Sequence, residues 1–372
     1  MNSNRIRLYE MMNRAGGMPL DEIDWENDFS DVSKTCMNPD ELLKYFNEIL
    51  TNHALNPDKR IKGQLLTHNK NIKFDEQGEI DVNGFIAQIT KIPHEVLSQN
   101  KKIQNSELAN EIGYNIGIPA LFGLVYDIEN KKFYKVSTCP GAGSCAKVCY
   151  ARKGNYVLLP AVSMKQTRIL NLLLNDPKLF EQILFEELKN AIVHNPGKTI
   201  TLRFNDAGDF FAKRFFQISK DITQNLLNAG YKFKSYAYTK MGDVINIGDP
   251  NMILNFSDDA SKLQKDKITR TDIKTSKIIP QTFFDEFLEK NDRGRYATDA
   301  QGKPMFKGNG LNLLKEKLSK EFNVPLDSIV TYSELLNIPE GNGNYNVIVM
   351  PKGDGDVGAR RNDVKISFLL QH

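Results

Sequence analysis

The sequence predicts an α/β protein whose main domain is a (β/α) barrel, closed or partial, behind a mainly helical N-terminal extension. From residue 119 onward, β-rich runs alternate with amphipathic helical patterns, which is typical of crossover units in a parallel sheet. Several of these runs end in polar clusters, as strands do at the ligand-binding face of such sheets. A chain of 372 residues is long enough for one barrel-sized domain with an extension.

The first part of the chain divides into two regions. Residues 1–60 are expected to form the helical extension, because 4–15 and 39–55 carry apolar residues at three- and four-residue spacing. Residues 61–118 are expected to be a mixed α/β connecting region. Its expected parts are short strands with turns and then a polar helix, over 63–93 and 94–113 respectively.

The barrel-like domain is expected to occupy 119–372. It opens with a hairpin that turns at Glu129-Asn130, and the long helix after the cysteine-rich loop is interrupted near Asp176-Pro177. The remaining predicted elements are, in order, a strand over 198–209, a helix over 210–230, and strands over 232–240, 251–259, 327–336 and 344–356.

The polar clusters at the ends of these strands are expected to share one face of the sheet and to bind a cofactor or substrate. The other explanation is that polar residues make the turns that end strands. Two tyrosines, Tyr236 and Tyr238, share one face of their strand and suit either base stacking or core packing. The candidate cofactor-binding residues are Asn205, Asp206, Gly208, Asp209, Lys240 and Ser257, with Thr239, Asp258 and Lys352 beside them.

Composition excludes some functional classes. No apolar run approaches the roughly 18 residues that cross a bilayer, and no secretory leader pattern is visible, so we expect an intracellular protein with no membrane partner. The formal net charge of +3 is too balanced to indicate nucleic-acid binding by itself. The basic run over 262–277 is expected to be a solvated face.

Three of the four cysteines lie within "TCPGAGSCAKVCYARKGNY", residues 138–156. Five residues separate Cys139 from Cys145, and three separate Cys145 from Cys149. Thiolates this close suit a [4Fe–4S] cluster with one open iron; zinc would need a fourth ligand, and simple packing is the third interpretation. Cys36 stands apart and is expected to be a small core residue.

Local features favour convergence of the three thiols. If a helix opens at Cys145, its sulfur and that of Cys149 lie on one face, and Gly141 and Gly143 let the loop carrying Cys139 fold back. We therefore expect the three sulfurs to meet at the same end of the sheet as the polar strand ends.

The order of strand, three-cysteine loop, helix, strand and Gly-acid loop resembles the start of the radical S-adenosylmethionine (SAM) enzymes. That resemblance implies a cluster on the three cysteines, which splits SAM to give a radical that abstracts hydrogen from a substrate. It also implies that Asp209 or Asp206 binds the SAM ammonium, Arg203 or Lys240 a carboxylate or phosphate, and Ser257 a ribose hydroxyl. The local alternative is that Asp209 caps the following helix.

A closer resemblance is to the uncharacterised bacteriophage gene-product-88-like family, which has a "CPG…C…CYA" block. The matching pieces are "GIPA", the cysteine block, "RFNDAGDFF", "YAYTK" and the tail "GDGDVGARRNDVKISFLLQH". This resemblance implies a phage origin, and hence the cytoplasm of the infected host cell or the virion, and it supplies no established reaction.

Two functions of different classes are therefore expected. The first is a radical SAM-like iron–sulfur enzyme that acts on a small-molecule or nucleotide substrate. The second is a non-catalytic, zinc- or cluster-stabilised module that binds nucleic acid or the virion. The second function is supported by four cations in and near a glycine-rich turn, a combination that suits phosphate binding. The other interpretation is that the turn is an ordinary exposed loop. The cations are Lys352, Arg360, Arg361 and Lys365.

Overall fold

The architecture comes from a computed structural model. It describes residues 34–37, 81–104, 108, 110–149, 151, 156, 159–300, 302–341, 343–350 and 354–370. The helices expected over 4–15 and 39–55 lie outside the described residues. Within the expected helical extension, β1 (Lys34–Met37) is a strand.

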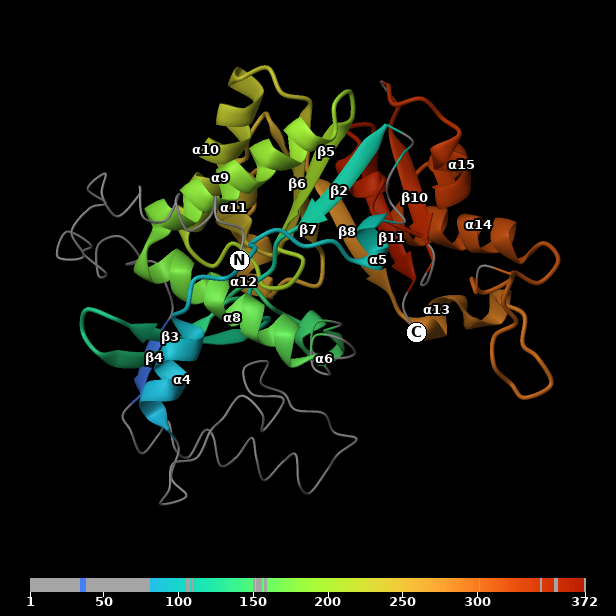
Figure 1. Ribbon diagram of the computed structural model, residues 1–372. Helices are drawn as coiled ribbons and strands as arrows, with labels where there is room; N and C mark the ends of the chain where they lie inside the picture. Colours follow the sequence, from blue (N-terminus) through green and yellow to red (C-terminus); the bar gives the residue numbers. More distant parts are fainter. Residues whose placement is uncertain are drawn as a thin grey trace.

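The core of the fold is an eight-stranded sheet in the order β2-β5-β6-β7-β8-β11-β10-β9, in which all neighbouring strands are parallel (Figure 1). The strands are β2 (Glu111–Asn115), β5 (Thr199–Phe204), β6 (Phe233–Thr239), β7 (Met252–Ser257), β8 (Lys274–Ile279), β9 (Ile329–Thr331), β10 (Tyr345–Val349) and β11 (Val364–Leu370). The predicted α/β class with a parallel sheet is confirmed. Among the described strands β2 and β9 are edges that do not pair with each other, so the sheet is open rather than closed into a barrel.

The strand order reverses once. Strands β5 to β8 lie side by side in chain order, whereas β9 to β11 run back from the far edge until β11 pairs with β8. The chain therefore reaches the far edge after β8 and returns, so β8 and β11 join two halves that are wound in opposite directions.

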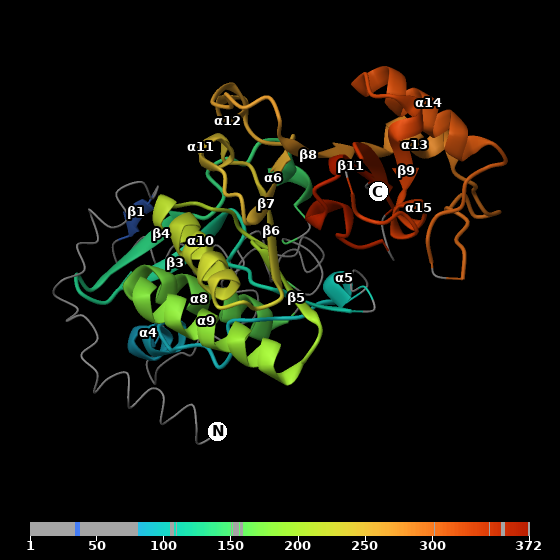
Figure 2. The same cartoon turned by 90° about the horizontal axis from the view of Figure 1, so that it is seen from above.

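Two helices, α9 (Pro177–His194) and α10 (Lys213–Asn228), pack on β5 and β6 of the sheet, and α8 (Pro160–Asn175) lies between α9 and the β3–β4 hairpin (Figures 1 and 2). The predicted interruption of the long helix is confirmed, because Asp176 separates α8 from α9 and accepts a hydrogen bond from the Leu179 amide at 2.9 Å. An aspartate cap before a proline at the first helical position is a strong start signal.

The smaller sheet is antiparallel and has the order β1-β4-β3. The predicted hairpin is confirmed as β3 (Phe122–Asp127) and β4 (Lys132–Ser137). The open edge of β3 is covered by α8, where the side chains of Asn171 and Asn175 exchange hydrogen bonds of 2.9–3.0 Å with its main chain. Amides one helical turn apart thus take the place of a missing strand.

The C-terminal half has two apolar layers, because side chains alternate across β10. Ile348 packs with the helices on one face, whereas Val347 and Val349 pack with residues on the other. Besides α4 and α5, which are given below, the further helical elements among the described residues are α6 (Cys145–Val148), α11 (Gly242–Ile247), α12 (Lys262–Asp266), α13 (Gln281–Phe284), η4 (Asp285–Phe287), α14 (Gly310–Phe322), η5 (Leu326–Ser328), α15 (Tyr332–Leu336) and η6 (Gly358–Arg360).

Some local predictions are wrong. A helix, α4 (Val82–Ile89), stands where short strands were expected. The described part of the predicted polar helix contains the four-residue α5 (Lys101–Gln104) and then the start of the edge strand β2, so the sheet begins before residue 119. The basic run is largely exposed over 262–272, as expected, but its end forms the central strand β8, whose Lys277 pairs with Asp258 at 2.7 Å.

The C-terminal strand β11 was not predicted either, and the run over 327–336 is a three-residue strand followed by helix α15. No helix among the described residues is long and apolar enough to cross a membrane.

Candidate functional site

The cysteine loop lies across the carboxyl ends of β6 and β7. A Cβ atom on Gly141 would lie 2.6 Å from the Lys240 carbonyl oxygen, so the loop backbone contacts the end of β6 directly. Ala142 forms an antiparallel bridge with Ala260, and the Ser261 amide donates to the Gly141 carbonyl at 2.9 Å. Glycine permits this close approach because it has no side chain.

The three thiols gather around one lysine. The Lys240 ammonium interacts electrostatically with Cys139, Cys145 and Cys149, and with the Asp209 carboxylate. Burial lowers the pKa of Lys240, but the negative charge of Asp209, and that of the three cysteines when they are ionised, outweighs burial and raises it above its ordinary value. The structure thus brings the cysteines to the same end of the sheet as Asp209 and Lys240.

Burial favours the protonated thiol at two of the three cysteines. Burial raises the pKa of Cys139 from 9.0 to about 12, although Lys240 acts in the opposite direction, and burial also raises the pKa of Cys145. The helix α6 that Cys145 opens has only four residues, and Cys149 is its C-cap. The Cys149 side chain packs, as Tyr156 does, against a small apolar cluster that contains Ala207.

A strained backbone position contacts one of these sulfurs. Leu121 has a φ of 66°, which is uncommon for a residue with a side chain, and its amide donates to the Cys139 sulfur at 3.4 Å. Its carbonyl accepts from the Thr138 amide at 3.0 Å. Both hydrogen bonds fix the start of the cysteine loop against the hairpin.

Asp209 is fully buried and joins the ends of β5 and β6. Its carboxylate accepts hydrogen bonds from the Phe210 amide at 2.8 Å, the Thr239 hydroxyl at 2.6 Å and the Lys240 amide at 2.9 Å. The expectation that it caps the next helix is wrong, because α10 begins at Lys213 with Ala212 as its N-cap. Asp209 instead fixes the main chain of Lys240.

Asp206 and Gly208 lie in the same turn. Asp206 accepts from Asn100 at 3.2 Å, from Asn115 at 3.1 Å and from the Tyr156 hydroxyl. Gly208 has a φ of 81°, and a Cβ atom there would lie 2.3 Å from the side chain of Ile118. The turn therefore has no room for a larger residue at this position.

One face of the sheet carries a buried network of charged and tyrosine side chains from β5 and β6. Arg203 lies 2.6 Å from Asp356, which also accepts hydrogen bonds from the hydroxyls of Tyr236 at 3.3 Å and Tyr238 at 3.2 Å. Both tyrosines share one face, as predicted, and burial followed by the Asp356 charge raises the pKa of each well above 10. The sequence gives no local signal for Asp356, whose partners are far away in the chain.

The glycine-rich turn near the C-terminus is neither an exposed loop nor a set of unpaired cations. Arg360 is buried 2.6 Å from Glu111, and Arg361 lies 2.7 Å from Asp363. The acidic residues that interleave with these arginines neutralise them inside the fold. Lys365 pairs with Asp272 at 2.5 Å, and Lys352 lies outside the described residues.

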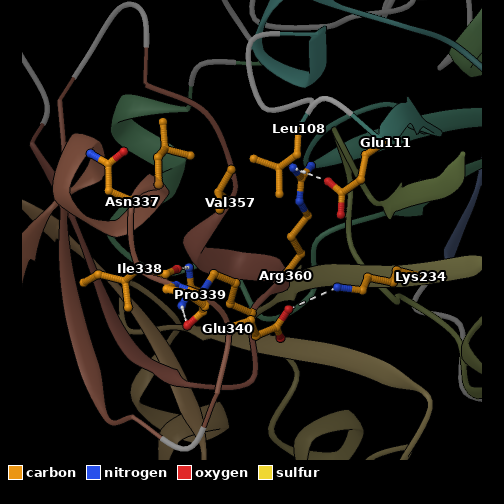
Figure 3. A pocket seen from close by; sticks show the side chains of 11 residues that line it. Leu108, Glu111, Lys234, Asn337, Ile338, Pro339, Glu340, Val357 and Arg360 are labelled. Atoms are coloured by element: carbon orange, nitrogen blue, oxygen red, sulfur yellow. Dashed lines mark hydrogen bonds and ion pairs between the residues drawn. The ribbon is translucent and has the colours of Figure 1, made fainter.

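A cavity of about 280 Å³ lies at the opposite, amino end of the strands (Figure 3). The ion pairs Glu111–Arg360 and Lys234–Glu340 line it. Each of these charges has a partner within the protein. The cysteines are at the other end of the sheet, so this cavity is separate from the thiol site.

The remaining predicted residues are placed as follows. Ser257 is nearly buried at the end of β7, and the neighbouring Asp259 accepts from the Ser144 hydroxyl of the cysteine loop at 3.2 Å. Cys36 is exposed on β1, so its expected place in a core is wrong. Among the described residues no group of three or more His, Cys, Asp or Glu side chains is arranged to hold a metal ion.

Comparison with known proteins gives one match. A protein-family model described as Gene product 88 matches residues 94–302, which is more than half of the chain and runs from before β2 to after β8. The matched span includes the cysteine loop and the polar ends of β5, β6 and β7. No curated protein and no solved structure matches the chain.

Proposed function

The chain belongs to the gene product 88 family, and we propose that it is an iron–sulfur protein with radical SAM-like activity. In this proposal Cys139, Cys145 and Cys149 bind a [4Fe–4S] cluster at the carboxyl end of the sheet. The substrate, a small molecule or nucleotide, binds over the same strand ends.

The observation that carries the proposal is the packing of the cysteine loop on the end of β6, which brings its three thiols within electrostatic range of the half-buried Lys240. Three cysteines that only filled space would have no need of a cation near them. A cluster with three thiolate ligands is negatively charged, and a nearby ammonium stabilises it. The Leu121 amide, which donates to the Cys139 sulfur, stabilises a thiolate in the same way.

The residues present fit such a cluster in kind and in charge, and the thiols must move to bind it. Metal ligation requires thiolates, whereas burial keeps Cys139 and Cys145 protonated here. The loop that carries them is fixed at its start by Leu121 and across its glycines by the ends of β6 and β7. Binding therefore needs deprotonation and a local closing of the sulfurs, while the sheet stays in place.

A cluster held by three cysteines leaves one iron open to a ligand and supplies single electrons to it. Asp209 serves this site indirectly, because its carboxylate is occupied by Phe210, Thr239 and Lys240. The Asp206 carboxylate is occupied in the same way, by Asn100, Asn115 and Tyr156, so either aspartate would bind the SAM ammonium by exchanging one of these hydrogen bonds. Lys240 balances the negative charge of the thiolates.

The nucleic-acid alternative rests on weaker ground. The arginines that suggested phosphate binding, Arg360 and Arg361, are held in ion pairs inside the protein. A phosphate could bind them only by breaking these buried pairs, at a cost of several kcal/mol (roughly 3–5).

The proposal is tested by anaerobic reconstitution with iron and sulfide, followed by absorption spectroscopy at about 400 nm. The parent protein should become brown, and so should the matched control Cys36→Ala, because Cys36 is exposed on β1. Each of Cys139→Ala, Cys145→Ala and Cys149→Ala should lose the colour while keeping its far-ultraviolet circular dichroism. A parent protein that stays colourless would refute the proposal.

A further inference from the structure

Asn205 adopts an unusual backbone conformation at the centre of the sheet. It directly follows the last residue of β5 and has a φ of 58°, in the left-handed region. Asparagine tolerates this region better than other residues, usually because its side chain makes a local hydrogen bond. In Asn205 that compensation is missing.

Both polar atoms of the Asn205 side chain are buried, and neither has a hydrogen-bond partner. Among the described residues it is the one side chain in which two separate polar atoms are both buried without partners. A buried amide without partners destabilises the fold, and such groups in native proteins call for an explanation. Strain and unmade hydrogen bonds at one residue are typical of sites that bind a ligand.

The turn that begins with Asn205 has partly exposed neighbours. Phe204 pairs with Ala237, so Asn205 comes level with the half-buried Tyr238 on the neighbouring strand. Two other half-buried residues contact the same turn: Gly117 lies against Asp206 and Ala207, and Cys149 packs on the cluster that contains Ala207. Asn205 is therefore buried next to partly exposed residues, at the same end of the sheet as the thiols.

We propose that the Asn205 amide binds a ligand group that presents a hydrogen-bond donor and acceptor side by side. The amide oxygen accepts and the amide nitrogen donates, so a matching edge forms two parallel hydrogen bonds. A purine edge and a primary carboxamide both have this chemistry, and asparagine reads the adenine edge in this way elsewhere. Tyr238, level with Asn205 on the neighbouring strand, already stacks on one planar group, because the Arg203 guanidinium lies 4.9 Å from its ring centroid.

This inference goes beyond the proposed iron–sulfur function and does not depend on it. The amide, its strain and its neighbours are present whether or not the thiols bind iron. The test therefore uses metal-free full-length protein, and its outcome is independent of the absorption experiment.

The test measures thermal unfolding and calorimetric titration with three probes: adenosine, nicotinamide and N6,N6-dimethyladenosine. Adenosine and nicotinamide present the donor–acceptor edge as a purine and as a carboxamide. N6,N6-dimethyladenosine is the comparison, because its exocyclic amine has no N–H to donate. We expect adenosine or nicotinamide to raise the melting temperature of the parent protein. The probe that binds more tightly shows whether the site prefers the edge of a purine or that of a carboxamide. The variant Asn205→Gly removes the amide and relieves the strain, so it should melt no lower than the parent and bind the effective probe at least tenfold more weakly.

Two further variants separate ligand binding from a structural role. Asn323→Gly is the matched control, because Asn323 also has a positive φ, of 50°, but lies at the end of α14; it should bind the probe like the parent. Asn205→Asp keeps the shape and removes the donor, so it should also weaken binding. The inference is overturned if neither adenosine nor nicotinamide binds the parent, if Asn205→Gly binds equally well, or if Asn205→Gly melts several degrees lower.

Discussion

The Nη1 atom of Arg203 lies 2.6 Å from a carboxylate oxygen of Asp356, and so joins two residues that are 153 positions apart in the chain. Arg203 is on β5 and Asp356 precedes η6, the short helix that contacts β6, β7 and β11. The pair therefore fixes the segment before the last strand against the inner face of the sheet.

Removal of one partner should be costly. We expect Asp356→Ala to lower the free energy of unfolding by about 3–5 kcal/mol, because it removes the nearer counterion of the buried Arg203 and leaves only Asp206, at 3.8 Å. The control Lys365→Ala removes an exposed pair with Asp272 and should cost about 0–1 kcal/mol. Urea unfolding of both variants measures the difference, and equal small losses would show that the buried pair contributes little.

We expect the Asp209 carboxylate to stabilise the fold through its hydrogen bonds. We expect Asp209→Asn to lower the free energy of unfolding by about 1–3 kcal/mol, because one acceptor oxygen becomes a donor that faces the Thr239 hydroxyl or the Lys240 amide. The matched control is Asp221→Asn on the exposed surface of α10, where little change is expected. Stability unchanged in both variants would contradict the assigned role.

Substitution of two glycines distinguishes the cost of backbone strain from the cost of a steric clash. Gly197 and Gly208 have φ values of 83° and 81°, but only Gly208 has a neighbour in the place of a Cβ atom, with Ile118 at 2.3 Å. Gly197→Ala should therefore cost about 1 kcal/mol from the backbone alone, and Gly208→Ala about 1–3 kcal/mol more. Thermal unfolding compares them, and equal costs would mean that the turn relaxes away from Ile118.

A buried lysine should make stability depend on pH. Burial lowers the pKa of Lys274 on β8 from 10.5 to about 7, although Asp363 and Glu340 act in the opposite direction. Between these two values the unfolded chain binds one proton more than the folded protein, so the free energy of unfolding rises as the pH increases from about 7 toward 10.5.

Urea unfolding across this pH range measures the slope. Lys274→Met should remove it, because methionine does not titrate. The control Lys262→Met changes a side chain that is 87% exposed and should leave the slope as it is. A parent protein without the slope would show that Lys274 stays charged in the folded state.

The sequence predicted those parts of the fold whose signals are local. The hairpin, the interruption at Asp176 and the strands β5, β6 and β7 follow from alternation, caps and turns close in the chain. Strand β8 was missed because Lys274 and Lys277 resemble a solvated run; both find partners from elsewhere in the fold. Whether the sheet closes depends on how its edges meet, which no local pattern encodes.

The candidate site, like the fold, could be predicted only where its signals are local in the sequence. Chain order alone placed the cysteines with the polar ends of β5 and β6, because parallel strands end at one edge. The roles of Asp209 and Asp356 depend on partners that only the folded chain brings together. The strain at Asn205 likewise has no signature in composition or spacing.

The central claim, that three cysteines around Lys240 bind an iron–sulfur cluster, is tested most directly by elemental analysis. Iron, acid-labile sulfide and zinc are measured per chain in protein purified and reconstituted without oxygen. The account predicts about four irons and four sulfides per chain, retained in Cys36→Ala and lost in Cys139→Ala. Stoichiometric zinc without iron, or no metal in the parent protein, would contradict it.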